Sequence, residues 1–372
     1  MTKTLTLGKT VSLTRTPAKS TQPEYDFGVY IGRFQPFHNG HLHCLMTALD
    51  KCKHVILLIG SAKRARSTRN PFKWTEVVEM ISGQLSPELK SRVSFIPLLD
   101  TYNNVLWTQN VQAAVAGTVS QHHVSPTGQA PKIALVGHSK DSTSFYLHMF
   151  PQWKSVNVSN VGGLSATPLR ETYFNADNPG VLATIAESIP ENTLKFLQDF
   201  ATTPVFSYLV EESRYIAKYR EAWNAAPYPP QFNTVDSVIV QSGHILLIER
   251  RSAPGKGLWA LPGGFVNVNE RFKDGMLREL TEETRIKVPA KVLEGSIVAE
   301  EMFDDPHRSE RGRVVTRAYL ITLEATTGGL PKVRGGDDAK RAVWIPLSEI
   351  DPEQMFEDHF HIIQTMLGKL HS

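Results

Sequence analysis

The chain has 372 residues, of which 41% are hydrophobic and 21% are charged, and its 40 basic and 37 acidic side chains leave a formal net charge of +3. A length of this order predicts two or three domains. The near balance of charge argues against a nucleic-acid binder. No segment approaches the roughly 20 uninterrupted apolar residues of a membrane span. We therefore expect an ordinary globular protein with neither nucleic acid nor membrane as a partner.

Residues 1–24 predict a flexible N-terminal tail. They are rich in Thr, Lys and Ser, contain Glu24 as their one acid and lack the apolar core of a secretory signal. An organelle transit peptide shares this acid-poor composition, so that alternative stays open. Two cysteines, Cys44 and Cys52, lie in or just after one apolar-periodic helix. They predict reduced, packed thiols and a cytoplasmic location, not a disulfide framework or a zinc site.

The segment 25–200 predicts an α/β domain with a doubly wound, Rossmann-like parallel sheet. Short apolar runs rich in β-branched residues suit strands buried on both faces; they are Phe27–Ile31, Val55–Ile59, Val93–Leu98, Ile133–Val136 and Val156–Val158. Helical periodicity lies between them, as in 41–51. Because strand and helix alternate, a ligand is expected at the carboxyl ends of the strands.

The segment 201–231 predicts a helical and proline-rich linker, and 232–372 a second domain of α+β type with a mixed sheet. Residues 182–222 read as helix with breaks near Pro190 and Pro204, and 225–230 are stiff and proline-rich. In the second domain a hairpin is expected around Ser242-Gly243, then a helix over 271–285, strands over 314–323 and 342–344, and a last helix over 352–370.

A first candidate site follows the first strand. The segment Gly32-Arg33-Phe34-Gln35-Pro36-Phe37-His38-Asn39-Gly40-His41 leads into a helix, and helix N-termini attract phosphate through unpaired N–H groups and the helix dipole. Imidazoles three residues apart can point to the same side of the first turn and donate to phosphate oxygens. Gly40 would let a nucleotide approach the backbone. Further along, Ser165, Thr167 and Arg170 offer hydroxyl and guanidinium donors.

These residues resemble the nicotinamide mononucleotide adenylyltransferases, over about residues 27–175. The resemblance rests on the Gly-Arg-Phe-x-Pro-Phe-His-x-Gly-His form, Asn70-Pro71-Phe72 after Gly60-Ser61, and the Ser-x-Thr-x-x-Arg run. It implies that His38, His41 and Arg170 hold the ATP phosphates as catalytic residues. It also implies nucleotide-binding roles for Gly32, Arg33, Phe34, Gly40, Gly137, His138, Asp141, Ser165 and Thr167. Trp74 and Trp107 are either stacking partners of nicotinamide or core aromatics. The phosphate acceptor is left open, since pantetheine phosphate or a flavin are alternatives.

A second candidate site combines glycines with three stacked acids. Five residues separate Gly264 from Glu270, and seven more separate Glu270 from Arg278. The same predicted helix then carries Glu279, Glu282 and Glu283. The three acids have i, i+3, i+4 spacing and therefore share one helix face. Like charges packed together call for a hard divalent cation, Mg²⁺ or alternatively Mn²⁺. Such an ion can bind a diphosphate and activate water.

This pattern resembles the Nudix box, with one departure at Arg285, where that family usually has Gly. The resemblance implies that Glu279 and Glu283 are metal ligands, assisted by Glu282 and the Gly263 carbonyl, that Glu282 and Glu283 are catalytic, and that Glu270 pairs with Arg278. Because the usual Gly ends the helix, Arg285 puts the local turn in doubt. The segment Phe303–Arg313 predicts either a substrate loop or an ordinary charged surface loop.

The whole chain resembles the bacterial bifunctional nicotinamide mononucleotide adenylyltransferase/ADP-ribose pyrophosphatases. That resemblance implies two Mg²⁺-dependent activities, synthesis of NAD from ATP and nicotinamide mononucleotide, and hydrolysis of ADP-ribose to AMP and ribose 5-phosphate. Two alternatives stay open for the second domain, a sanitiser of oxidised nucleotides and a sensor of ADP-ribose or NAD. A transcriptional regulator would need a basic helix pair, which does not follow residue 340. A homo-oligomer also stays open.

Overall fold

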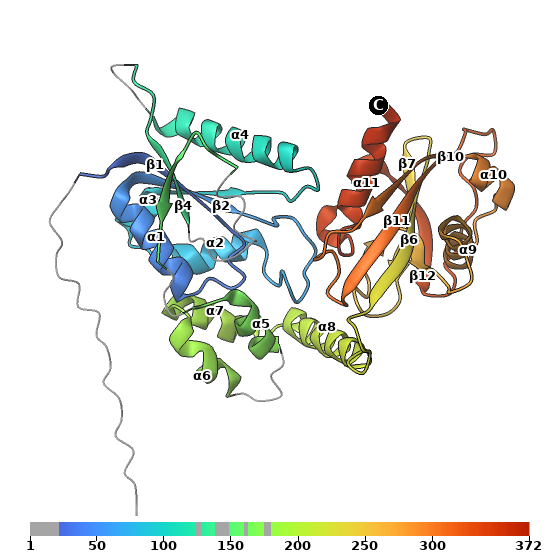
Figure 1. Ribbon diagram of the computed structural model, residues 1–372, viewed down its shortest axis with the longest axis horizontal. Coiled ribbons are helices and arrows are strands. Elements are labelled where there is room, and N and C mark those ends of the chain that lie inside the picture. The colour runs from blue at the N-terminus through green and yellow to red at the C-terminus, as the bar shows by residue number, and fades with distance from the viewer. Residues whose placement is uncertain (1–21, 124–127, 138–148, 160–162, 175–179, 372) are drawn as a thin grey trace, which may run out of the picture.

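The computed structural model describes residues 22–123, 128–137, 149–159, 163–174 and 180–371. It contains two separate sheets, each covered by helices (Figure 1). Most of the expected N-terminal tail, together with His138 and Asp141, lies outside the described residues. In the described ranges, every helix is too short or too polar to cross a bilayer. Cys44 and Cys52 are both buried and unpaired, which confirms the expectation of packed thiols.

The first sheet confirms the predicted doubly wound α/β fold. In the described residues its five strands have the order β3-β2-β1-β4-β5, and all neighbours pair in parallel. Their bounds are β1 Tyr25–Gly32, β2 Cys52–Ile59, β3 Val93–Pro97, β4 Ile133–Gly137 and β5 Lys154–Asn157. β1 lies in the middle of the sheet, with β2 leading to one edge and β4 leading to the other. The strand order therefore changes direction at the end of β1. A crevice outside the carboxyl ends of the strands is expected at that point.

Both faces of this sheet are buried, as the continuous apolar runs predicted. Along β2, Val55, Leu57 and Ile59 face one core, and Ile56 and Leu58 face the other. Helices α1 (Asn39–Lys51) and α2 (Trp74–Ser82) cover the first face, and α4 (Asn104–His122) covers the second. The short helix α3 (Pro87–Ser91) precedes β3.

The helical stretch after β5 breaks where the sequence predicted. It consists of α5 (Ala166–Phe174), α6 (Val181–Ile185), the 3-10 turn η2 (Ala186–Ser188), α7 (Glu191–Phe200) and α8 (Pro204–Glu221). The Thr203 side chain caps α8 by accepting from the Phe206 amide at 3.2 Å. Leu209 and Val210 of α8 pack into the first core, while the helix runs on toward the second sheet (Figure 1). The boundary at 201–231 stays a prediction.

The second sheet confirms the predicted mixed α+β domain. Among the described residues it has seven strands, with the path β10-β11-β6-β7-β12 and with β8 and β9 paired to β7 and β6. The strands are β6 Gln231–Gln241, β7 His244–Arg250, β8 Trp259–Ala260, β9 Gly263–Phe265, β10 Ile297–Phe303, β11 Arg313–Thr322 and β12 Ala339–Pro346. Among the described strands of this sheet, β6 and β11 pair in parallel and the other neighbours are antiparallel. The hairpin turn has the expected positive φ at Ser242 and Gly243.

Helices cover this sheet on both faces. Met276 and Leu280 of α9 (Phe272–Thr284) join one core with Val235 and Ile239. On the other face, Ile362, Ile363 and Met366 of α11 (His359–Gly368) join a second core. The remaining short elements are α10 (Ala290–Gly295), η3 (Leu347–Glu349), η4 (Pro352–Gln354) and η5 (Lys369–His371). The acid-bearing helix α9 therefore rests on one face of a rigid sheet beside β9.

Candidate active sites

The histidine pair of the first motif forms the N-terminal cap of α1. His38 is the N-cap residue, and its Nδ1 accepts from the Gly40 amide at 3.1 Å. The His38 amide in turn donates to Nδ1 of His41 at 3.3 Å, and the two rings stack with centroids 3.7 Å apart. Because each Nδ1 acts as an acceptor, the neutral form of each ring carries its proton on Nε2. The local sequence thus fixes both imidazoles at a positive helix end.

Gly40 also makes room for the capping histidine, while its predicted role in the approach of a nucleotide stays a prediction. A Cβ at this position would lie 3.0–3.1 Å from the His38 ring. The space that glycine leaves is therefore used by the capping histidine. Gly32 has a similar role, since a Cβ there would lie 2.7 Å from the Phe34 ring. Both glycines shape the site through protein side chains.

Arg170 ties α5 to the loop before α1. Its guanidinium donates to the Gln35 carbonyl at 2.7 Å and to Oγ1 of Thr167 at 3.2 Å. The Gln35 side chain donates to the Phe72 carbonyl at 2.8 Å and accepts from the Phe72 amide at 3.0 Å. The Asn70-Pro71-Phe72 motif is thereby held against the same loop. Three segments that are distant in sequence converge at one end of the sheet.

These segments surround a cavity of about 760 Å³. Six residues expected to bind nucleotide line it, namely Arg33, Phe34, His41, Ser165, Thr167 and Arg170. Gly32, His38, Gly40 and Gly137 are not part of its described lining, and His138 and Asp141 lie outside the described residues. Gly137 ends β4 and accepts from the Val158 amide at 2.9 Å. Trp74 and Trp107 do not line the cavity either; both pack against the hydrophobic cores.

The cavity is cationic, because arginines outnumber the two glutamates, Glu171 and Glu310, in its described lining. Arg33, Arg69, Arg170 and Arg220 all line it. Burial, reinforced by the charges of Arg69 and Arg170, lowers the pKa of Arg33 to about 10. Crowded, partly desolvated guanidinium groups repel each other until an anion binds. A polyphosphate is the kind of ligand that this arrangement favours.

Sequence reasoning missed several residues of this wall. Thr68 and Arg69 directly precede the Asn70-Pro71-Phe72 motif, so their position beside it was a usable signal. Arg220 comes from α8. Five further residues come from the segment of the second domain that was predicted to be either a substrate loop or a surface loop, and the sequence did not indicate that they line this cavity; they are Pro306, His307, Ser309, Glu310 and Gly312.

The second motif places two glutamates beside the glycine turn. Glu283 is buried, and its Oε2 accepts from the Gly263 amide at 2.9 Å. A Cβ on Gly264 would lie 2.7 Å from the Glu279 carboxylate, and a Cβ on Gly263 would lie 2.0 Å from the Val235 carbonyl. The Gly-Gly pair is therefore needed for the close packing of β9 between β6 and α9. Glu279 and Glu283 share the helix face that meets this turn.

Arg278 makes the predicted pair with Glu270. Its Nε and NH2 groups donate to the two Glu270 carboxylate oxygens at 3.0 and 2.5 Å. These bonds lower the pKa of Glu270 to about 2. The same guanidinium donates to Glu279 at 2.8 Å and to Glu282 at 3.0 Å. Arg278 is thus the centre of a four-residue network that fixes the loop.

Glu279 and Glu283 fit a divalent cation by their chemistry. Burial raises the pKa of Glu283 to about 8, with a further contribution from Glu279, and burial also raises the pKa of Glu279. Two neighbouring, largely desolvated carboxyl groups are what a hard cation would stabilise. In the described part of the chain, however, no three His, Cys, Asp or Glu side chains are gathered closely enough to hold a metal. Glu282 is half exposed and paired with Arg278, so its role, like that of the Gly263 carbonyl, stays a prediction.

Arg285 makes the helix-ending turn despite the missing glycine. It adopts the left-handed conformation, with φ +45° and ψ +34°, and its amide donates to the Thr281 carbonyl at 2.9 Å. The doubt about the local turn is therefore resolved. A non-glycine residue carries it at a cost in backbone strain.

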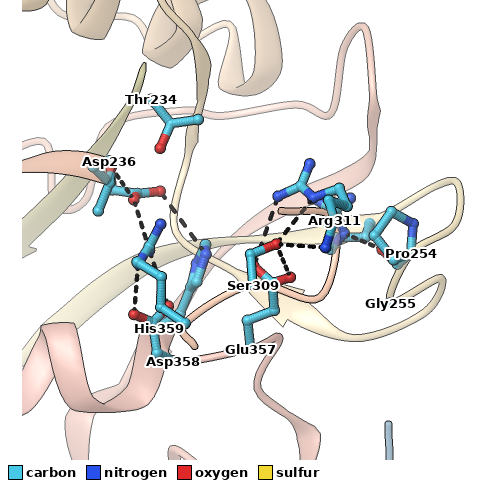
Figure 2. Close-up of polar contacts among 12 residues, drawn as sticks. Thr234, Asp236, Pro254, Gly255, Ser309, Arg311, Glu357, Asp358 and His359 are labelled. Atoms are coloured by element: carbon cyan, nitrogen blue, oxygen red, sulfur yellow. Dashed lines mark hydrogen bonds and ion pairs between the residues drawn. The ribbon is translucent and has the colours of Figure 1, made fainter. Parts of the chain in front are cut away.

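The segment Phe303–Arg313 is not an ordinary surface loop, because it contains a buried charge cluster. Arg308 is bonded to the fully buried Asp358 through Nε at 2.8 Å and NH2 at 3.0 Å. Tyr102 of the first domain donates to the same carboxylate at 2.6 Å. Figure 2 shows Asp358 beside Asp236 and His359 in this cluster. The loop is thereby anchored to α11 and to the first domain together.

A second anchor lies next to it. Ser309 donates to Oε1 of Glu357 at 2.7 Å, and Oγ of Ser309 accepts from the Arg311 amide at 3.3 Å (Figure 2). Arg311 is also 3.7 Å from the Glu357 carboxylate. These contacts hold Ser309 and Arg311 of the loop against Glu357.

Comparison with known proteins supports both halves of the chain. Residues 230–366 match the model of the NUDIX domain, and residues 29–126 match the cytidylyltransferase-like model. A nicotinamide/nicotinic acid mononucleotide adenylyltransferase of Acinetobacter baylyi is 35% identical over 193 residues, which are 51% of this chain and 95% of the relative. An ADP-ribose pyrophosphatase of Methanocaldococcus jannaschii is 34% identical over 152 residues, 41% of this chain and 82% of the relative.

One solved structure is similar over almost the whole chain. It is a bifunctional NMN adenylyltransferase/ADP ribose pyrophosphatase of Francisella tularensis, crystallised with AMP and a manganese ion. The sequences are 34% identical, the TM-score is 0.83, and the match covers 93% of this chain and 99% of that one. The order and the arrangement of both domains are therefore shared.

Proposed function

The chain belongs to the family of bifunctional NMN adenylyltransferases/ADP-ribose pyrophosphatases, and we propose that its two activities reside in the two sites described above. The first transfers AMP from ATP to nicotinamide mononucleotide, which gives NAD and pyrophosphate. The second hydrolyses ADP-ribose to AMP and ribose 5-phosphate. The observation that carries the assignment is the convergence of His41 with Arg33, Arg69 and Arg170 on one cavity, separate from the acidic face of α9.

In the first site, the protein positions two phosphorylated substrates. The mononucleotide phosphate attacks the α-phosphorus of ATP, the bond to the β-phosphate oxygen breaks, and pyrophosphate leaves. Because the attacking phosphate is already anionic, no protein base is required. His41 and Arg170 would donate to phosphate oxygens on which charge builds up, and the N-terminus of α1 adds its dipole. Catalysis is then mostly orientation and charge stabilisation.

In the second site, Glu279 and Glu283 would hold Mg²⁺, and Glu282 would assist. The ion would bind the diphosphate and lower the barrier to attack by water on phosphorus. The Gly263 amide orients Glu283, and Arg278 orients Glu279 and fixes the loop through Glu270. Since carboxylates must be ionised to bind a cation, the raised pKa of Glu283 implies that metal binding releases a proton near neutral pH.

The buried, unpaired cysteines support a cytoplasmic location.

Two substitutions test the assignment. His41→Ala should lower NAD synthesis by about 10²–10³-fold and spare ADP-ribose hydrolysis, because a phosphate donor is lost from the first site alone. Glu283→Gln should lower ADP-ribose hydrolysis by a similar factor and spare NAD synthesis. Each protein is incubated with Mg²⁺, ATP and nicotinamide mononucleotide, and separately with ADP-ribose, and the products are separated by chromatography.

Matched controls lie on the same two helices. His43 is an exposed histidine of α1, and Asp274 is an exposed acid of α9. His43→Ala and Asp274→Asn should leave both reactions unchanged. The assignment of separate sites fails if either test variant loses both activities, or if His41→Ala retains NAD synthesis.

A further inference from the structure

The second domain supplies part of the wall of the first active site. The segment Pro306–Gly312 lies between β10 and β11 of the Nudix domain, yet five of its residues line the cationic cavity. Its contacts with the first domain are polar and specific. Thr68 donates to Oε1 of Glu310 at 2.8 Å, and Arg69 donates to the His307 carbonyl at 2.7 Å.

A third bond reaches the same segment from α8. The Nε group of Arg220 donates to the Glu310 carbonyl at 2.8 Å. The main chain of Glu310 is thus fixed from one side, and its carboxylate is fixed by Thr68 from the other. A residue whose main chain and carboxylate are both held in place can fix the position of the residue that its carboxylate contacts.

The charge of Glu310 decides what it can contact. Burial raises the pKa of Glu310, and its ionised form repels phosphate, so Glu310 is poorly suited to bind an anionic substrate. Its favourable partners are the hydroxyl of Thr68 and the guanidinium groups that line the same cavity. Burial lowers the pKa of Arg69, and Glu310 is among the acids that partly offset this effect. Glu310 is therefore placed to hold the Thr68–Arg69 segment through the bond from Thr68, without binding the substrate.

The loop is rigid enough for this role. Arg308 and Ser309 are buried, and the bonds to Asp358 and Glu357 hold the two positions that precede Glu310. Tyr102 connects that anchor to the first domain. The geometry of the loop is thus defined by both domains.

We propose that Glu310 is a positioning residue of the adenylyltransferase site that is carried by the Nudix domain. By accepting from Thr68, beside the bond from Arg69 to His307, it keeps the Thr68–Arg69 segment in the orientation that directs Arg69 to the phosphates in the cavity. The inference rests on the proposed function of this cavity. It implies that the first activity depends on a loop of the second domain, although the two reactions occur at separate sites.

Three single variants and one double variant test the proposal in the full chain. Glu310→Ala and Thr68→Val should each raise the KM for a nucleotide substrate of NAD synthesis about tenfold, which corresponds to about 1.4 kcal/mol, with a much smaller change in kcat. Glu310→Gln keeps an acceptor oxygen for Thr68 and should stay within about threefold of the parent protein. The combined Thr68→Val/Glu310→Ala variant should be no worse than either single variant, because both remove the same bond.

ADP-ribose hydrolysis measured on the same samples is the control for folding and should be unchanged. The proposal is overturned if Glu310→Ala leaves the KM unchanged, if both reactions fall together, or if the effects of the two single variants simply add. Its failure is distinct from that of the proposed function. If His41→Ala abolishes NAD synthesis while Glu310→Ala leaves the KM unchanged, only the positioning role is lost.

Discussion

The hydroxyl of Tyr102 is a contact between the domains that a single atom change removes. Its ring packs against the second domain, with its centroid 5.8 Å from that of Phe303, and its hydroxyl donates to Asp358 at 2.6 Å. Tyr102→Phe keeps the ring contact and deletes only this hydrogen bond. We expect it to lower the free energy of unfolding.

The magnitude follows from what the carboxylate retains. A hydrogen bond to a charged group contributes about 1.5–3 kcal/mol. Asp358 is fully buried but keeps both bonds to Arg308 after the change, so the larger cost of an unpaired buried charge does not arise. We expect a loss of about 2 kcal/mol for Tyr102→Phe. Arg308→Met removes the counter-ion and should cost about 3–5 kcal/mol.

The pKa of Asp358 reports the same balance. Burial, the largest single effect, raises this pKa, but the charges of Arg308 and His359 and the hydrogen bonds from Arg308 and Tyr102 together keep the pKa below its ordinary value. A folded pKa below the unfolded one contributes stability above the unfolded pKa, and that stability is lost as the pH falls. The free energy of unfolding of Arg308→Met should therefore fall less as the pH is lowered, because Asp358 no longer contributes its share of that fall.

Urea unfolding followed by tryptophan fluorescence measures the loss, with each transition fitted separately because two domains need not unfold together. Tyr228→Phe is the control, since that tyrosine is 81% exposed and lies in the proline-rich linker. The reasoning is refuted if Tyr102→Phe and Tyr228→Phe differ by less than about 0.5 kcal/mol, which is the usual range for surface changes. It is also refuted if Arg308→Met costs no more than Tyr102→Phe.

Two further predictions concern backbone strain and pH. Arg285→Gly should be more stable than Arg285→Ala by about 1 kcal/mol, because only glycine adopts φ +45° without a steric cost; equal melting temperatures would contradict the strain argument. Burial, with the charges of His122 and Arg92, lowers the pKa of His54 to about 4. The stability that neutral His54 contributes is therefore complete above its unfolded pKa of about 6.5 and is lost as the pH falls toward about 4, on the order of 1–2 kcal/mol after allowance for partial exposure. His54→Gln should lack this loss in urea titrations at several pH values, and parallel curves for the two proteins would exclude it.

Much of the first domain could be predicted because its signals are local. The β2 strand is buried on both faces, and a continuous apolar run is the direct consequence of that environment. The histidine pair could be assigned because the cap of α1 uses residues three positions apart. Arg69 was not predicted, since a lone arginine in a loop has no periodicity to distinguish it. Its position beside Asn70-Pro71-Phe72 was a signal that the sequence offered, and the bonds between Gln35 and Phe72 show the reason, because they hold that motif against the loop before α1.

In the second domain, the longest of the strands that were missed is the edge strand β10; the short strands β8 and β9 were missed as well. Strand β10 pairs with β11 on one side only, and it leaves Val298 and Met302 about half exposed. An edge strand faces solvent along part of its length, so its sequence mixes acids with apolar residues and shows no clean alternation. Parallel pairing of β6 with β11 was also beyond prediction, because it depends on chain segments about 80 residues apart.

The loop between β10 and β11 shows why the spacing of residues along the chain predicted the acidic face of α9 but not the wall of the cavity in the first site. Glu279 and Glu283 act together because one turn of helix brings them together, and that relation is written in their separation along the chain. Arg308 has its partner in Asp358, 50 positions away, and Asp358 in turn accepts from Tyr102, which is 206 positions from Arg308. Seen alone, a charged stretch with a proline is typical of solvent-exposed loops. It is buried here because complementary charges exist on two other segments, and such long-range complementarity becomes visible only when the domains are placed together.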